Sequence, residues 1–558
     1  MAPNPLLLSI KTLNPIFLPF STKTLTLRKP SPITCRTSSS SAAAPPPPPL
    51  SVEPEGSGAA APTRGDRFLE RHNSMSAAAV VIKKDRAKNK KKKPEAKASS
   101  AVACCYGCGA PLQTTEVDAP GYVDSGTYEL KKRHRQLRTI LCGRCRLLSH
   151  GHMVTAVGGH GGYPGGKQFV SAEELREKLS HLRREKVLIV KLVDIIDFNG
   201  SFLARIRDLA GANPIILVIT KIDLLPKGTD LNCIGDWVVE ATTKKKLNVI
   251  SIHLTSSKSL VGIAGVISTI QKEKKGRDVY ILGSANVGKS AFVNALLKMM
   301  SQKDPVAAAA RKYKPMQSAV PGTTLGPIEI EAFLGGGKLF DTPGVHLHHR
   351  QAAVVHSEDL PSLAPQSRLR GQSFPALSRK STLKDTDDVG LNGFSLFWAG
   401  LVRIDVIKVL PQTRLTFYGP KKLQIHMVPT VEANEFYHKE LGIILTPPTS
   451  KERAESWIGL EAVRHLQIKF EDQRRPACDI AISGLGWIAV EPIGMQLETD
   501  SNNAEDDSMR ELHLSVHVPK PVEIFVRTPM PVGKAGGDWY HYQELTEKEE
   551  EVRPKWFY

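Results

Sequence analysis

The sequence predicts a multidomain α/β protein in which a sheet covered on both faces is followed by a mostly β domain. Three observations indicate this fold. Short apolar runs alternate with helical stretches, a phosphate-loop pattern follows one of the runs, and strand-like segments recur after Leu391. The apolar runs are Val187–Val193, Pro214–Ile219, Val249–Leu254, Val279–Leu282, Ile328–Phe333 and Lys338–Phe340.

Length and charge narrow the class of protein. The chain has 558 residues, and its 75 Lys and Arg against 56 Asp and Glu give a formal net charge of +19. That excess favours an anionic partner, nucleic acid before membrane, since no amphipathic anchor is evident. No run approaches the roughly 18 apolar residues of a membrane helix. Eight cysteines are too few for a disulfide scaffold.

The first 36 residues have the composition of an organelle transit peptide. They contain no acidic residue, the first being Glu53, and they are rich in Ser, Thr, Pro and Leu. Ile33–Arg36 resembles a plastid processing site, and the Ser and Thr content favours the chloroplast (stroma or nucleoid) over the mitochondrion. Plain terminal disorder is the alternative. Residues 37–103 are expected to be a disordered linker, whose basic run Lys83–Lys97 is either solvated or contacts phosphates.

Residues 104–165 are predicted to form a zinc module. Two Cys-x-x-Cys knuckles can turn four sulfurs toward one ion and complete a closed tetrahedral site, whose role is structural. Four reduced thiols and an iron–sulfur cluster are the alternatives, and His150 and His152 lie near enough in sequence to substitute as ligands. The predicted zinc ligands are Cys105, Cys108, Cys142 and Cys145.

A phosphate loop is predicted at 283–290, between a strand and a helix, where the sequence fits G-x-x-x-x-G-K-[ST]. Its glycines let backbone N–H groups surround the phosphates. Lys289 supplies a cation to the outer phosphates, and Ser290 offers a hydroxyl to Mg²⁺. The residues expected to contact the nucleotide here are Gly283, Ser284, Ala285, Asn286, Val287, Gly288, Lys289 and Ser290.

Two further motifs predict contacts to the metal and the γ-phosphate. Asp341–Gly344 (DTPG) ends the next apolar strand, where Asp341 can reach Mg²⁺ through water and the Gly344 N–H can meet the γ-phosphate. Pro321–Thr324 (PGTT) lies in a loop between the two motifs and offers Thr323 and Thr324. The predicted Mg²⁺ ligands are Ser290 and Thr324. The residues expected to act in catalysis are Lys289, Thr324, Asp341, Gly344 and Asn286.

The predicted nucleotide is GTP or GDP rather than ATP. In Thr220–Asp223 (TKID), the Asp carboxylate can accept from guanine N1–H and N2–H, which adenine does not provide. The usual motif begins with Asn, so Thr220 is a departure. Thr255–Lys258 (TSSK) follows the next strand as a second guanine loop, and which of its N–H groups meets the base stays open. The predicted base-binding residues are Thr220, Lys221, Asp223, Ser256, Ser257 and Lys258.

The order of these motifs is unusual, because both guanine loops precede the phosphate loop. In the usual GTPase the phosphate loop comes first. The order resembles that of the circularly permuted GTPases, and several segments look like the YqeH branch, whose plant members are called nitric-oxide-associated. The resemblance runs from about residue 104 to 558. Its motifs are Cys105–Gln113, Asp194–Ser201, Gly283–Ser290, Pro321–Leu325 and Asp341–Gln351.

This resemblance implies a zinc module, a circularly permuted P-loop GTPase with a Ras-like sheet (170–356) and a C-terminal RNA-binding-type domain (391–558). It also implies slow GTP hydrolysis and binding to ribosomal RNA during small-ribosomal-subunit assembly in plastids. A protein that uses GTP only as a structural ligand is one alternative. An enzyme of nitric oxide metabolism is another, for which no haem-thiolate, flavin or nicotinamide motif is found.

The C-terminal half is less specific. Residues 357–390 are rich in Ser, Pro and charge and are expected to be an inserted loop. Helices are expected near 434–441 and 455–466, among strands. Gly484–Trp487 (GLGW) is expected to be a tight turn into a strand. The aromatic tail Pro554–Tyr558 is expected either to stack on bases or to pack back onto the domain.

The residue after the DTPG motif raises the question of what drives hydrolysis. Many GTPases have a Gln there to orient water, but this chain has Val345. A K⁺ ion held by Asn286, as in related potassium-activated GTPases, is one source of the missing group; His346 and the ribosome are rivals. The motif also leads directly into the C-terminal domain, so its movement can bias the docking of that domain.

Overall fold

The computed structural model forms one compact unit over residues 98–558. It describes residues 102–150, 170–203, 206–245, 249–318, 322–375, 390–409, 413–470, 474–492, 511–542 and 546–558. The predicted transit peptide, the linker with its basic run and residues 151–165 of the predicted zinc module lie outside the described residues. None of the described helices combines the length and the apolarity needed to cross a bilayer.

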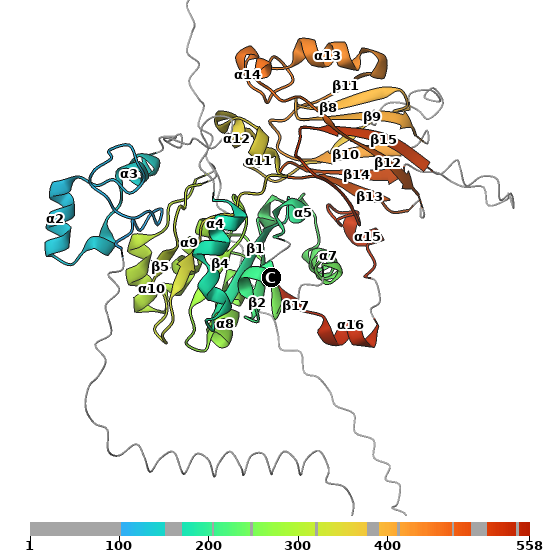
Figure 1. The fold of residues 1–558 in the computed structure, drawn as a ribbon. Coiled ribbons are helices and arrows are strands. Elements are labelled where there is room, and N and C mark those ends of the chain that lie inside the picture. Colours follow the sequence, from blue (N-terminus) through green and yellow to red (C-terminus); the bar gives the residue numbers. More distant parts are fainter. Residues whose placement is uncertain are drawn as a thin grey trace, which may run out of the picture. The chain divides into compact units, whose positions relative to one another are not determined.

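A seven-stranded sheet forms the centre of the described GTPase region (Figure 1). All six predicted apolar runs form strands in it, and every neighbouring pair is parallel except β5 and β6. In spatial order its strands are β17 (Lys555–Phe557), β3 (Ser251–Leu254), β2 (Ile215–Thr220), β1 (Leu188–Asp194), β4 (Val279–Leu282), β6 (Leu339–Asp341) and β5 (Ile328–Ile330).

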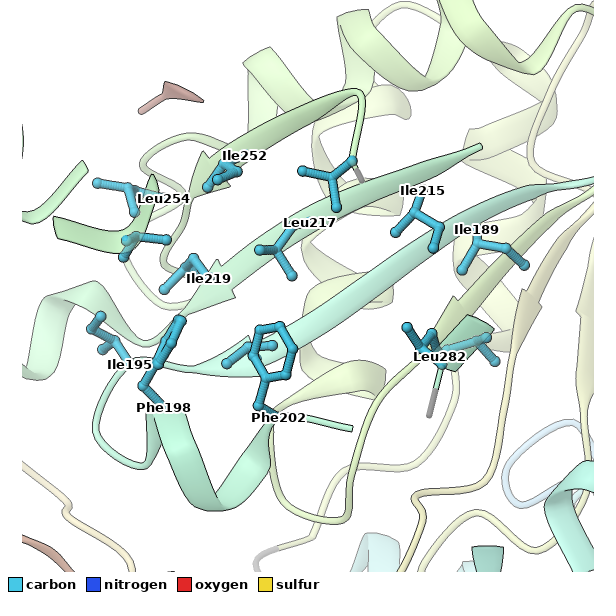
Figure 2. Close-up of a cluster of buried hydrophobic side chains, with 14 of the residues drawn as sticks. Ile189, Ile195, Phe198, Phe202, Ile215, Leu217, Ile219, Ile252, Leu254 and Leu282 are labelled. Carbon is cyan, nitrogen blue, oxygen red and sulfur yellow. The ribbon is translucent and has the colours of Figure 1, made fainter. Parts of the chain in front are cut away.

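Both faces of this sheet are covered because its central strands are apolar at nearly every position. Alternate residues of β1 and β2 point to opposite faces. Those on one face pack with α7 and α5, as Figure 2 shows for Leu217, Ile219 and Phe198. Those on the other face pack with α8 and α9. The helices of this region are α4 (Ala172–Lys178), α5 (Phe198–Ser201), α6 (Ile206–Ala210), α7 (Leu231–Lys244), α8 (Ile263–Lys274), α9 (Lys289–Met300), α10 (Pro305–Ala310) and α11 (Gln351–Val354).

The C-terminal region is mostly β, as predicted. Two antiparallel five-stranded sheets, β16-β13-β14-β10-β7 and β11-β8-β9-β15-β12, contribute to one apolar core. The strands are β7 (Gln372–Phe374), β8 (Phe394–Trp398), β9 (Val402–Lys408), β10 (Thr413–Tyr418), β11 (Ile425–Pro429), β12 (Ala462–Lys469), β13 (Cys478–Ile482), β14 (Gly486–Pro492), β15 (Glu511–Val518) and β16 (Ile524–Arg527). Its helices are α12 (Leu360–Leu363), α13 (Ala433–Glu440), α14 (Lys451–Glu455), α15 (Gly536–Trp539) and α16 (Glu547–Val552).

Two predictions for this region are corrected. The helix expected at 455–466 is wrong, because α14 ends at Glu455 and residues 462–469 form β12, which pairs along its whole length with β15. The inserted loop expected at 357–390 contains regular structure in its first part, namely α12 and β7. Strand β7 pairs with β10, and this pairing gives residues 372–374 a regular structure that their composition did not predict. Residues 376–389 lie outside the described ranges.

The aromatic tail packs back onto the protein, but on the GTPase sheet rather than on the domain that precedes it. Strand β17 extends that sheet beside β3. The indole of Trp556 lies on Gly235 of α7, where an added Cβ would come within 2.4 Å of the ring, so only glycine fits. Its Nε1 donates to Asp236 Oδ1 at 2.9 Å. The predicted boundary of the C-terminal domain at residue 558 therefore needs correction.

Candidate nucleotide and metal sites

The phosphate loop turns from β4 into α9 with two residues in left-handed conformation, Asn286 (φ 62°) and Gly288 (φ 91°). Lys289 is buried at the centre of the loop, where its ammonium donates to the carbonyls of Gly283 (3.2 Å) and Ser284 (2.8 Å). Burial lowers the pKa of Lys289 to about 8, although Asp341 opposes the shift. The loop therefore presents a cation from inside a curved backbone, which suits a bound phosphate.

Three predicted metal contacts meet beside this loop. Ser290 Oγ donates to Asp341 Oδ2 at 2.7 Å and lies 3.4 Å from Thr324 Oγ1. Asp341 Oδ1 is buried and has no hydrogen-bond partner among the described residues. Burial raises the pKa of Asp341 to about 6, against the effects of Ser290 and Lys289. A hard, oxygen-only set with an unsatisfied carboxylate oxygen fits Mg²⁺.

Gly344 closes the site from the far side. A Cβ on this residue would lie 2.7 Å from Ala285 Cα and 2.9 Å from Lys289 Nζ. The backbone after the DTPG motif can therefore approach the phosphate loop only without a side chain. Together with Thr323 and Thr324, these residues line a cleft of about 430 Å³, a volume within the usual range for ligand sites.

The base-binding residues are only partly brought together. Ser256 is buried, and its hydroxyl donates to Asp223 Oδ1 at 2.7 Å, which fixes the carboxylate predicted to read guanine. In the same loop, Ser257 is half-buried and Lys258 is exposed. Among the hydrogen bonds and ion pairs of the described residues, none joins either of them to Asp223.

Thr220 connects the guanine motif to the phosphate loop. Its hydroxyl lies 2.8 Å from the carbonyl of Val287, within that loop, and 3.2 Å from the carbonyl of Val193. Lys221, next in sequence, donates to the carbonyl of Asn286 at 2.8 Å and to Asp194 Oδ2 at 2.5 Å. The departure from Asn therefore leaves a short polar side chain bridging the two loops.

Four cysteine sulfurs cluster as the sequence predicts. Their Sγ atoms lie within 4.8 Å of one another, and all four residues are buried in the module that contains α2 (Ser125–Arg133) and α3 (Gly143–Ser149). Four converging soft ligands fit a tetrahedral zinc ion. His150 does not belong to the cluster, and His152 lies outside the described residues. The clustered residues are Cys105, Cys108, Cys142 and Cys145.

The cysteine module holds the loop that carries Thr323 and Thr324, a contact that sequence reasoning missed. The carbonyl of Cys108 accepts from Leu325 N at 2.7 Å, and Arg144 donates to the carbonyls of Gly322 (3.1 Å) and Thr323 (3.3 Å). The backbones approach so closely that a Cβ on Gly109 would meet the Gly326 carbonyl at 2.2 Å. The predicted metal loop is therefore fastened to the knuckles.

A buried ion pair behind the phosphate loop was also missed. Arg350 donates from Nε to Asp197 Oδ2 at 2.9 Å and from Nη1 to the carbonyl of Ala285 at 2.6 Å. Burial raises the pKa of Asp197, while Arg350 opposes the shift. The GLGW turn of the β domain lies against this pair. Gln351 N donates to the carbonyl of Ser483, just before the turn, at 2.9 Å. A Cβ added to Gly484 would lie 3.0 Å from Gln351 N, so the two backbones are in close contact.

Val345, which stands where many GTPases have the water-orienting Gln, and His346, a candidate for that role, lie near the Asp197–Arg350 pair. Val345 is buried and forms isolated parallel bridges with Val170 and Ser284. His346 is buried and lines a small pocket with Asp197 and Arg350, rather than the cleft that holds Lys289 and Thr324. The only sequence signal for Asp197 and Arg350 was that they lie in two segments, 194–201 and 341–351, that resemble the YqeH branch.

Two segments of the chain match families of known proteins. Residues 278–365 match the family described as "50S ribosome-binding GTPase", and residues 412–504 match "YqeH-like, C-terminal". The chain is 67% identical over 512 residues to "NO-associated protein 1, chloroplastic/mitochondrial" of Arabidopsis thaliana, which covers 91% of each chain.

Two of the more distant relatives are bacterial. The chain is 29% identical to "Uncharacterized protein YqeH" of Bacillus subtilis over 76% of this chain and 98% of the relative. It is 26% identical to "Small ribosomal subunit biogenesis GTPase RsgA" of Prochlorococcus marinus, over 45% of this chain and 77% of that one. The GTPase region is thus related to GTPases of ribosome biogenesis.

Proposed function

Because the chain belongs to the YqeH-like GTPase family that includes the plant NO-associated proteins, we propose that it is a GTP-gated factor for ribosome assembly. It binds and slowly hydrolyses GTP and holds ribosomal RNA of the small subunit in plastids. The observation that carries the GTPase part is that Lys289, Ser290 and Thr324 line one cleft, where Ser290 also donates to the buried Asp341. The ribosomal part is supported by the relatives' descriptions and the basic charge.

We infer that the sheet is a circularly permuted Ras-like sheet. The phosphate loop follows β4, while the two guanine loops follow β2 and β3, earlier in the chain. In space these strands lie on either side of β1, in the order β3-β2-β1-β4. Parallel strands end at the same edge, so the three loops can meet one nucleotide whatever their order along the chain.

The proposed chemistry uses position and charge. Lys289 binds the outer phosphates, and the Gly344 N–H donates a hydrogen bond to the γ-phosphate. Mg²⁺, held by Ser290 and Thr324 with Asp341 behind, would offset phosphate charge. Asp223, fixed by Ser256, accepts from the guanine edge. These residues position the nucleotide. The contacts of Cys108 and Arg144 with the loop at 322–325 keep Thr324 within reach of the Mg²⁺.

The gating is proposed to pass through Arg350. Its guanidinium links the phosphate loop to Asp197, beside the GLGW turn of the β domain. A shift of residues 344–350 on γ-phosphate binding would then alter how that domain docks.

Arg350→Lys is expected to retain GTP binding and weaken this gating. Lysine has one terminal nitrogen and lacks the planar fork that reaches Asp197 and the Ala285 carbonyl together. The ratio of ribosomal-subunit affinity between the GTP and GDP states should fall about fivefold or more, by the scale of typical allosteric coupling. Arg414→Lys, which alters an ion pair with Glu491 inside the β domain, is the matched control. An unchanged ratio in Arg350→Lys would remove Arg350 from the gate.

Hydrolysis is expected to be faster in K⁺ than in Na⁺, roughly tenfold or more, if a cation held by Asn286 stabilises transition-state charge. Asn286→Gly is the informative variant, because glycine accepts the positive φ of this position while removing the side-chain oxygen. The difference between the salts should vanish in the variant. Equal rates of the native protein in both salts at matched ionic strength, with nucleotide bound, would point to His346 or the ribosome.

The proposal is tested by incubating the purified protein with GTP and Mg²⁺, with and without ribosomal subunits. We expect slow release of phosphate that subunits accelerate. GTP binding with no hydrolysis in either condition would favour GTP as a structural ligand instead.

Plastid targeting is proposed from the first 36 residues and supported by the Arabidopsis relative's description as chloroplastic/mitochondrial. A fluorescent protein carrying residues 1–60 should enter chloroplasts. Import only into mitochondria would reverse the assignment.

A further inference from the structure

A second, larger cleft of about 970 Å³ lies between the GTPase sheet and the β domain. It shares no lining residue with the nucleotide cleft. Residues of α7 and α15 belong to its lining. Its walls are joined by two direct contacts: Trp237 Nε1 donates to the carbonyl of Thr528 at 3.2 Å, and Arg527 Nη1 donates to Asn199 Oδ1 at 3.3 Å.

The lining of this cleft is strongly basic. Five cationic side chains line it, against a single carboxylate, Glu240. Glu240 accepts from Lys244 at 2.6 Å, while Lys469 pairs with Glu511 at 3.1 Å and Arg527 pairs with Asp479 at 3.2 Å, both carboxylates lying outside the lining. With these three carboxylates counted, the five cations leave an excess of two positive charges. Such an excess in a concave surface attracts polyanions. The cations are Lys244, Lys245, Lys469, Arg475 and Arg527.

The same walls carry aromatic rings and buried polar atoms without partners. Trp539, Tyr540 and Tyr542 are half-buried rings of the lining, whereas Trp237 is only 2% exposed and lies under the Arg527 guanidinium. The Oη atoms of both tyrosines and Nη2 of Arg527 are buried and lack a hydrogen-bond partner among the described residues. The Arg527 side chain is only 7% exposed. Because these atoms are themselves covered, they belong to the polar interior of the cleft wall and are not groups that a ligand reaches directly.

We propose that this cleft binds a single-stranded segment of RNA. Cations along the rim neutralise phosphates, and the half-buried rings of Trp539 and Tyr540 stack on unpaired bases. An acidic peptide would use the charges but leave the ring faces without stacking partners. The inference rests on the proposed ribosomal function and specifies where the RNA lies.

The position of the cleft couples its width to the nucleotide state. Its two walls belong to the GTPase sheet and to the β domain. Asn199, which contacts Arg527, lies two residues from Asp197, the partner of Arg350. A GTP-dependent change in the docking of the β domain would therefore widen or narrow the cleft.

The test is the salt-dependent binding of the full chain to a fluorescent 12-nucleotide oligouridylate. The cleft variant carries Lys245→Gln, Lys469→Gln and Arg475→Gln, all at exposed positions. Its Kd should rise at least about tenfold, and the slope of log K against log salt should become shallower by about 2, since three phosphate contacts are lost. Trp539→Leu should weaken binding severalfold without changing the slope.

The control variant neutralises three exposed lysines outside the cleft, Lys421, Lys422 and Lys439, and makes the same change in net charge. Equal RNA affinity of the two triple variants, with GTP binding intact, would overturn the cleft assignment while leaving ribosome binding in place. Failure of the native protein to bind either RNA or ribosomal subunits would overturn the proposed function as well. Polyglutamate displacing RNA with equal affinity would indicate an acidic protein partner instead.

Discussion

Replacing Asp223 by Asn is expected to lower GTP affinity by about 10²–10⁴-fold, because two hydrogen bonds to a charged acceptor are lost at roughly 1.5–3 kcal/mol each. The carboxylate is held by Ser256 at 2.7 Å, so its orientation toward the base is fixed. An Asn at this position offers one acceptor and one donor. That pattern matches xanthine, which carries oxygen where guanine has an amino group, and the variant should prefer xanthosine triphosphate.

Competition against a labelled guanine nucleotide measures this change. Ser256→Ala serves as the matched control, since it removes the bond that fixes Asp223 but keeps the carboxylate, and it should weaken GTP binding without altering the base preference. Equal affinity of the native protein for ATP and GTP would contradict the guanine assignment.

The second large effect is expected on removing the cysteine cluster. The double variant Cys108→Ser and Cys142→Ser should lose about one zinc per chain, since a closed tetrahedral site does not survive the loss of two ligands. It should also lower single-turnover GTP hydrolysis about tenfold or more, because the Cys108 carbonyl and Arg144 no longer hold the loop of Thr324.

Cys104→Ser is the matched control, because Cys104 adjoins the cluster in sequence but is not one of its four residues. It should retain zinc and activity. Metal analysis and hydrolysis are measured on the same preparations. If the double variant keeps its zinc, the assignment of the four cysteines as zinc ligands is wrong. If it loses zinc but hydrolyses GTP at the native rate, the cysteine module does not support the loop of Thr324.

The sequence predicted those parts of the fold that depend on local pattern. The apolar runs became strands of the central sheet, and the phosphate loop lies between β4 and α9 because glycines and a following helix are local features. The helix expected at 455–466 failed because pairing with β15 overrode local helix preference.

The remaining features depend on contacts between distant residues. Arg350 and Asp197 are 153 positions apart, and Arg144 contacts Thr323 across 179 positions. The pairing of β17 with β3 also depends on Gly235, whose missing side chain admits Trp556. No periodicity or composition reports such partners, since each needs the folded sheet to bring it together.

The central proposal is a GTP-gated factor of the small ribosomal subunit, and co-sedimentation tests it most directly. The full chain, loaded with a non-hydrolysable GTP analogue, is centrifuged with purified plastid small or large subunits. We expect stoichiometric recovery of the protein with the small subunit in the GTP-analogue state and its release in the GDP state. Equal recovery in both nucleotide states, or recovery with the large subunit alone, would contradict it.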